Sequence, residues 1–136
     1  MGNALASFGG FDDFLLYLGV SLALLALFAA VYVRVTPYRE IALIREGNMA
    51  AAYSLSGSLL GFIVPLASSV QYSVGIIDMA IWGAIALTVQ VAAYVVVKLM
   101  MPSITRGIPE GNAAQGFFLG AVSLGVGILN SACMSY

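Results

Sequence analysis

The sequence predicts an all-α fold: a polytopic membrane protein with four transmembrane helices, built as two tandem, parallel helical-hairpin repeats. Three observations predict it. The 136 residues are 62% hydrophobic and only 8% charged, whereas a soluble domain carries about 25% charged residues. Apolar stretches of about 20 residues, the length needed to cross a bilayer, occur four times. The second half of the chain also repeats the pattern of the first.

The four predicted spans are residues 14–33, 49–70, 79–97 and 113–134. The first contains no charged residue, and the second and fourth are rich in glycine and serine. Residues 1–13 lack the basic residues of a signal peptide, so we interpret the first span as an uncleaved helix. The remaining segments are short, and residues 1–136 are predicted to form a single membrane domain.

The basic residues predict the orientation in the membrane. They follow the first and third spans and are Arg34, Arg39, Arg45, Lys98 and Arg106. Cytoplasmic loops carry an excess of lysine and arginine. We therefore expect the loops 34–48 and 98–112 to lie in the cytoplasm and both termini to lie outside it.

The repeat has a period of about 64 residues and predicts hairpins at 11–72 and 76–136. Pro37 matches Pro102, and Glu46-Gly47-Asn48 matches Glu110-Gly111-Asn112. A unit of two spans returns the chain to its starting side, so the two copies are predicted to be related by an axis along the membrane normal.

Small and polar residues recur every three or four positions on the second and fourth spans, which places each set on one helix face. They are Ser54, Gly57, Gly61 and Pro65 in the second span and Gly116, Gly120, Ser123, Gly127 and Asn130 in the fourth. We expect these two helices to form the centre of the bundle, shielded by the other two. The stripes either allow close backbone contact or line a pathway for a small solute, and the sequence leaves both open.

Two further features lie within the spans. Pro65 removes one backbone hydrogen bond from its helix, and we expect Ser68 and Ser69 to compensate for it. Gln90 lies near the middle of the third span, where an amide is costly unless it is hydrogen-bonded. We interpret Gln90 and Asn130 as residues that bond between helices, with contact to a solute as the alternative.

The two loops with basic residues contain a second set of candidate residues. They either cap the helices or form a surface that binds a cytoplasmic partner, and they are Arg39, Arg45, Glu46, Asn48, Glu110 and Asn112. Asn48 and Asn112 suit helix N-caps. Residues 37–46 predict a short interfacial helix capped by Thr36, whose arginines reach lipid phosphates.

The composition argues against an enzyme and against a cofactor or metal site. The chain has no histidine and one cysteine, and no Asp, Glu, Lys or Arg lies inside a predicted span, so no base, catalytic pair or ligand cluster is available. The same absence argues against proton-coupled transport. A net charge of -1 offers no basic field for nucleic acid. Cys133 is expected to be a small buried apolar residue.

Several motifs are similar to those of a known family. They are the stretch Ser56-Gly57-Ser58-Leu59-Leu60-Gly61-Phe62-Ile63-Val64-Pro65-Leu66, Thr36-Pro37, the repeated Glu-Gly-Asn and the closing Asn130-Ser131-Ala132-Cys133-Met134. On these the chain resembles the YjfL-type bacterial inner-membrane proteins, whose domain is of unknown function (domain of unknown function 350). The resemblance implies four spans and a plasma-membrane location. It also implies an association with envelope-stress modules, since members of the family tend to be encoded beside phage-shock-protein-like membrane remodellers. It supplies no catalytic residues.

Two function hypotheses follow. The first is a non-enzymatic, homo-oligomeric scaffold in envelope homeostasis or stress response, whose partners are the lipid bilayer, further copies of the chain and a cytoplasmic membrane-remodelling or stress protein. The alternative is a passive channel or carrier for a small ion or solute, lined by the second and fourth helices.

Overall fold

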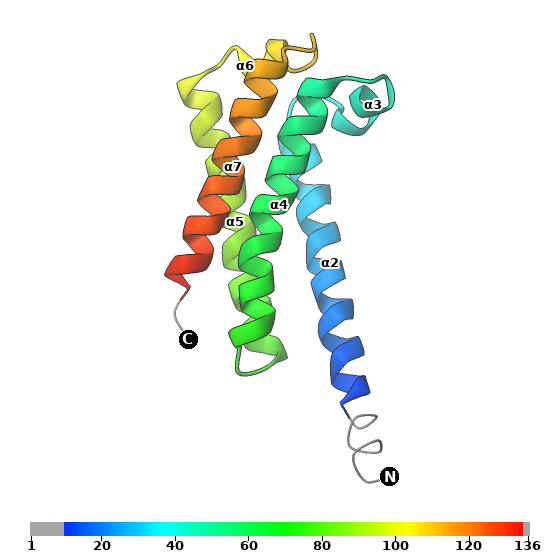
Figure 1. Ribbon diagram of the computed structural model, residues 1–136, viewed down its shortest axis with the longest axis vertical. Helices are drawn as coiled ribbons and strands as arrows, with labels where there is room; N and C mark the ends of the chain where they lie inside the picture. The colour runs from blue at the N-terminus through cyan, green and yellow to red at the C-terminus, as the bar shows by residue number, and fades with distance from the viewer. Residues whose placement is uncertain (1–9, 135–136) are drawn as a thin grey trace.

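The computed structural model describes residues 10–134, and this part of the chain contains only helices and their connections (Figure 1). Four helices are long and apolar enough to cross a membrane: α2 (Phe11–Val35), α4 (Met49–Tyr72), α5 (Ile76–Met100) and α7 (Ala113–Cys133). Two short helices, α3 (Glu40–Arg45) and α6 (Ile104–Gly107), lie in the connections. The predicted fold class and its four spans are confirmed, while the tandem duplication stays a prediction.

The ends of the bundle differ in charge. The short helices α3 and α6 lie at one end, and both ends of the described chain lie at the other, together with the turn between α4 and α5 (Figure 1). Acidic residues begin α2 and α5, and Arg34 and Lys98 lie in their last turns. This arrangement favours both helices, because anionic groups stabilise a helix N-terminus and cationic groups a C-terminus.

The centre of the bundle is the pair α4 and α7, which run side by side with α5 behind them (Figure 1). In the most apolar window of each helix, 50% of the residues are buried in α4 but only 6% in α2. The expectation that the first and third spans only shield the centre needs correction, because α5 is buried about as much as α7, with 33% and 28%. Small residues on its inner face, Gly83, Ala86 and Ala93, bring α5 into the core.

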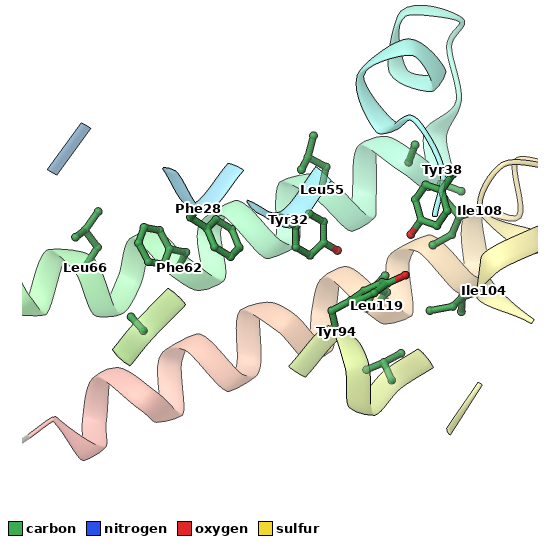
Figure 2. Packing of buried hydrophobic residues seen from close by; sticks show 14 residues of the cluster. Phe28, Tyr32, Tyr38, Leu55, Phe62, Leu66, Tyr94, Ile104, Ile108 and Leu119 are labelled. Carbon is green, nitrogen blue, oxygen red and sulfur yellow. The ribbon is translucent and has the colours of Figure 1, made fainter. Parts of the chain in front are cut away.

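Aromatic rings attach α2 to the rest of the bundle. Phe28 stacks on Phe62 of α4 with ring centroids 4.6 Å apart, and Tyr32 meets Tyr94 of α5 edge-on at 5.6 Å. Figure 2 shows these rings between the helices. Such pairs contribute about 0.5–1.5 kcal/mol each beyond their burial. Phe28 and Tyr32 are the two residues of α2 that are fully buried, and the partly buried Leu24 and Leu25 pack against the same core.

Two local expectations were wrong. The short helix begins at Glu40, not at Pro37, and Thr36 does not cap it; Thr36 is instead the C-cap of α2 and its hydroxyl donates to the Glu40 carboxyl group. Cys133 is exposed rather than buried. It lies in the last turn of α7, and Leu129, one turn earlier, is 67% exposed on the same side of the helix.

Candidate functional site

The closest contact in the bundle is a seam of glycines between α4 and α7, which we call the glycine seam: Gly57, Gly61, Gly116, Gly120 and Gly127. A Cβ atom added to Gly57 would lie 2.3 Å from the Cα atom of Gly120. One added to Gly116 would lie 2.2 Å from the carbonyl oxygen of Ala50. Ordinary contacts of a Cβ atom begin at 3.4 Å. The two backbones therefore touch, and no side chain larger than hydrogen fits between them.

Pro65 explains one of these contacts. A proline has no amide hydrogen, so the carbonyl group four residues earlier, that of Gly61, loses its partner within α4. A Cβ atom on Gly127 would lie 1.9 Å from this oxygen. Gly127 therefore presents its Cα hydrogens to the freed carbonyl, a geometry suited to a weak C–H···O contact between helices.

The serines next to Pro65 have other partners than we expected. The Ser69 hydroxyl donates to the carbonyl of Met79 at 2.8 Å, and the Ser68 hydroxyl bonds to Ser131 of α7. Neither serine compensates for the missing amide within α4, because each bonds to a neighbouring helix.

Further polar bonds cross the seam near the middle of the helices. The Gln90 amide of α5 donates to the carbonyl oxygen of Ser123 at 3.0 Å, and the Ser58 hydroxyl donates to the hydroxyl oxygen of Ser123 at 3.3 Å. Ser54 bonds within its own helix, to Ala51. Asn130 is half-buried and its amide nitrogen has no hydrogen-bond partner in the described part of the chain. Gln90, Ser58 and Ser123 thus join three helices at one level.

The two Asn residues before α4 and α7 are N-caps. Asn48 accepts a hydrogen bond from the amide of Ala51, and Asn112 accepts one from Gln115. The preceding Gly47 and Gly111 have φ angles of 86° and 85°, a conformation that favours glycine.

The Asn48 side chain has a second role, which Asn112 does not share. Its amide nitrogen donates to the carbonyls of Ile108 at 2.9 Å and Pro109 at 3.2 Å. Asn48 therefore ties the start of α4 to the loop before α7, and its polar atoms are occupied within the chain.

The charged residues of the two loops are open to a partner. Arg39, Arg45, Glu46 and Glu110 are all exposed. Arg39 and Arg45 line a groove of about 360 Å³ beside α3, together with Val33, Ile41 and Ala42. Cationic groups above an apolar floor fit the headgroup region of a membrane.

A buried carboxyl group lies directly behind this groove, and it was not among the candidates from the sequence. Glu40 is 1% exposed; one carboxyl oxygen accepts the Thr36 hydroxyl hydrogen and the other has no hydrogen-bond partner among the described residues. Three tyrosine hydroxyls, from Tyr32, Tyr38 and Tyr94, point toward one another (Figure 2), and all three tyrosines interact electrostatically with Glu40. We call these five residues the Glu40 cluster.

Burial decides the acidity of the groups in this cluster that lie outside the spans. Loss of hydration raises the pKa of Glu40 from 4.5 to about 7, and the Thr36 hydroxyl opposes the shift only in part. Burial also raises the pKa of Tyr38 far above its usual range. Burial therefore favours the neutral, protonated form of the Glu40 carboxyl group.

Sequence reasoning missed Glu40 because a single acidic residue in a loop between two spans is typical of a solvated loop. The signal that was available is the density of tyrosines at the same end, since Tyr32 and Tyr38 flank Thr36 and precede Glu40. No group of three or more His, Cys, Asp or Glu side chains able to hold a metal ion occurs in residues 10–134.

The chain is similar to membrane proteins of two bacteria. Residues 5–134 match the family described as Domain of Unknown Function (DUF350). The UPF0719 inner membrane protein YjfL of Escherichia coli (strain K12) is 38% identical over 120 residues, covering 88% of this chain and 91% of that protein. The UPF0719 transmembrane protein YshE of Bacillus subtilis (strain 168) is 27% identical over 118 residues, covering 85% and 88%. No solved structure matches the chain.

Proposed function

Because the chain belongs to the DUF350 family of integral membrane proteins, we propose that it is a non-enzymatic, homo-oligomeric scaffold of the bacterial inner membrane that acts in envelope homeostasis or stress response. The observation that carries this proposal is the glycine seam. Backbones in direct contact between α4 and α7 leave no room for a solute between these two helices, so the outer surfaces of the chain are what it offers to other molecules.

The proposed surface between copies is the outer face of α4 and α7, which α2 and α5 leave open (Figure 1). A groove of about 240 Å³ runs along this face, lined by small residues such as Ser56, Gly57 and Ala121. Tyr53 and Phe117 meet edge-on beside it, with ring centroids 5.7 Å apart. Small residues on a lipid-facing helix surface favour close approach of another helix.

Cysteine crosslinking tests this surface, because Cys133 is the only cysteine. In a Cys133→Ala background, Ala121→Cys should form covalent dimers in native membranes on mild oxidation. Ala92→Cys is the matched control, since Ala92 is an exposed alanine on α5 and lies eight residues from the α3 and α6 end of its helix, as Ala121 does. Equal crosslinking of the two variants, or native mass measurements that detect only monomer, would contradict the oligomer.

The proposed surface for a cytoplasmic membrane-remodelling or stress protein consists of Arg39, Arg45, Glu46 and Glu110. Their exposure at one end of the bundle supports it. Reversing all four charges keeps the number of basic residues at that end unchanged, so the positive-inside bias is preserved. The reversed variant should lose partner recruitment and stress tolerance at normal expression. Unchanged recruitment and tolerance would refute the surface.

The proposed orientation places α3 and α6 in the cytoplasm and both termini outside it. All five basic residues lie at or beside the end of the bundle that carries α3 and α6, which supports this orientation. A reporter that works only outside the cytoplasm should be active at either terminus. A reporter that works only in the cytoplasm should be inactive at both. A reporter that is active inside the cell at both termini would overturn the orientation.

The alternative function, a passive channel or carrier lined by α4 and α7, is disfavoured by the same seam. Purified protein in liposomes should give no flux of ions or small metabolites above empty vesicles. Flux that Gly57→Leu abolishes, while Gly125→Leu preserves it, would favour the alternative, because only Gly57 lies in the seam.

A further inference from the structure

Glu40 is the only one of the six acidic residues that the fold buries. Asp12, Asp13, Glu46 and Glu110 are exposed and Asp78 is half-buried, whereas Glu40 is 1% exposed. It is also the first residue of α3, so its carboxyl group attaches that helix to the bundle.

Within residues 10–134, no positively charged side chain offsets the charge of this carboxyl group. Arg39 and Arg45 line the neighbouring groove but are themselves exposed. One carboxyl oxygen is bonded to the neutral Thr36 hydroxyl and the other has no partner among residues 10–134. A buried carboxylate without a counter-ion is strongly disfavoured, and such a group ordinarily becomes neutral instead.

The groups facing Glu40 come from several elements. Titratable side chains are Tyr32 from α2, Tyr38 from the connection and Tyr94 from α5. The helix α4 contributes hydroxyls only, from Ser54 beside Tyr38 and Ser58 beside Tyr32. Apolar side chains close the cluster from the α6 and α7 side: Ile104, Ile108 and Leu119 (Figure 2). On the bundle side the surroundings of Glu40 are therefore neutral, with hydroxyl groups as the polar contacts, while Arg39 and Arg45 lie on the groove side.

We propose that Glu40 is a proton-binding site, which carries a proton in the closed bundle and exchanges it with water through the groove beside α3. The groove supplies the route, because Glu40 is part of its lining. The tyrosine hydroxyls supply mobile hydrogen-bond partners that can accept from the protonated carboxyl group or donate to the ionised one. A proton also needs no cavity, unlike a metal ion.

The consequence of proton release is a loosening of α3. An ionised Glu40 is stabilised by hydration, and water reaches it when the start of α3 moves away from Tyr38 and Tyr94. The proton on Glu40 therefore couples the pH at this end of the bundle to the position of the helix that carries Ile41 and Arg45.

Infrared difference spectroscopy of the full chain in lipid, between pH 5 and pH 9, tests the proposal. The wild type should give a protonated-carboxyl band that titrates close to neutral pH. Glu40→Gln, which mimics the neutral carboxyl group and should fold, should lose this band. Glu46→Gln is the matched control at an exposed position six residues later and should keep the band with its midpoint unchanged.

A second variant keeps the test independent of Glu40→Gln. Thr36→Val removes the hydroxyl that favours the ionised carboxylate, so the midpoint should rise by about one to two pH units. The proposal is overturned if the neutral band persists in Glu40→Gln or if it titrates near 4, as for an exposed carboxyl group. It is also overturned, in favour of an alkali-metal site, if sodium or potassium chloride lowers the midpoint and choline chloride does not.

Discussion

Replacing Gly127 by alanine tests the glycine seam most directly. The added Cβ atom would lie 1.9 Å from the carbonyl oxygen of Gly61, so α7 must move away by about 1.5 Å to reach an ordinary contact. Overpacking of this kind costs about 1–3 kcal/mol. The movement also stretches the bond from Gln90 to Ser123, which is worth about 0.6 to 2 kcal/mol between helices in a membrane. The two losses sum to about 2–5 kcal/mol, and alanine recovers about 1 kcal/mol over glycine in a helix, so we expect a net loss of about 1–4 kcal/mol.

The assay is reversible unfolding in mixed micelles with increasing denaturing detergent, followed by the fluorescence of Trp82, the one tryptophan. Gly125→Ala is the control, because Gly125 lies on the same helix and a Cβ atom there has no neighbour within 4 Å. This variant should be as stable as the wild type or slightly more stable, since alanine favours a helix over glycine.

The reasoning fails if Gly127→Ala and Gly125→Ala unfold at the same detergent fraction. Backbone contact between α4 and α7 could then not be what holds the two halves of the chain together, and the argument against a pathway between them would lose its basis.

Three further predictions use the same unfolding assay. Asn48→Ala should lose more stability than Asn112→Ala, which should lose about 1 kcal/mol, because only Asn48 also bonds to the loop before α7; equal losses would contradict this. Gln90→Met should cost about 1 kcal/mol and Thr88→Val almost nothing, since the Thr88 hydroxyl bonds within its own helix; a larger loss for Thr88→Val would refute the assignment. The free energy of unfolding of the wild type should fall by up to about 3 kcal/mol between pH 4.5 and 7. Burial raises the folded-state pKa of Glu40 to about 7, so the unfolded chain releases its proton first as the pH rises. Glu40→Gln should show no such fall, and an equal slope in both chains would exclude Glu40 as the cause.

The spans, the caps and the small-residue faces could be predicted because each is encoded locally. Hydropathy gives the four helices, and Asn48 and Asn112 stand directly before apolar runs that need a cap. The spacing of Gly57 and Gly61 indicates a face for close approach. These features depend on residues within one or two helical turns of one another.

The Glu40 cluster could not be predicted because it depends on contacts between distant segments. Tyr94 comes from the third span, 54 positions after Glu40, and reaches it only because α5 packs behind α4. The start of α3 moved from the predicted Pro37 to Glu40 for the same reason: the Thr36 hydroxyl bonds to a buried carboxyl group instead of a free amide. Burial of a lone acidic residue leaves no pattern in the sequence.

The contrast between α2 and the α4–α7 pair restricts how this protein can change shape. Interlocked main chains prevent α4 and α7 from sliding or rotating against each other without first separating. By comparison, α2 is attached through side chains, the buried Phe28 and Tyr32 and the partly buried Leu24 and Leu25. Any change of shape in this protein would therefore move α2 against the α4–α7 pair more easily than it would move α4 against α7.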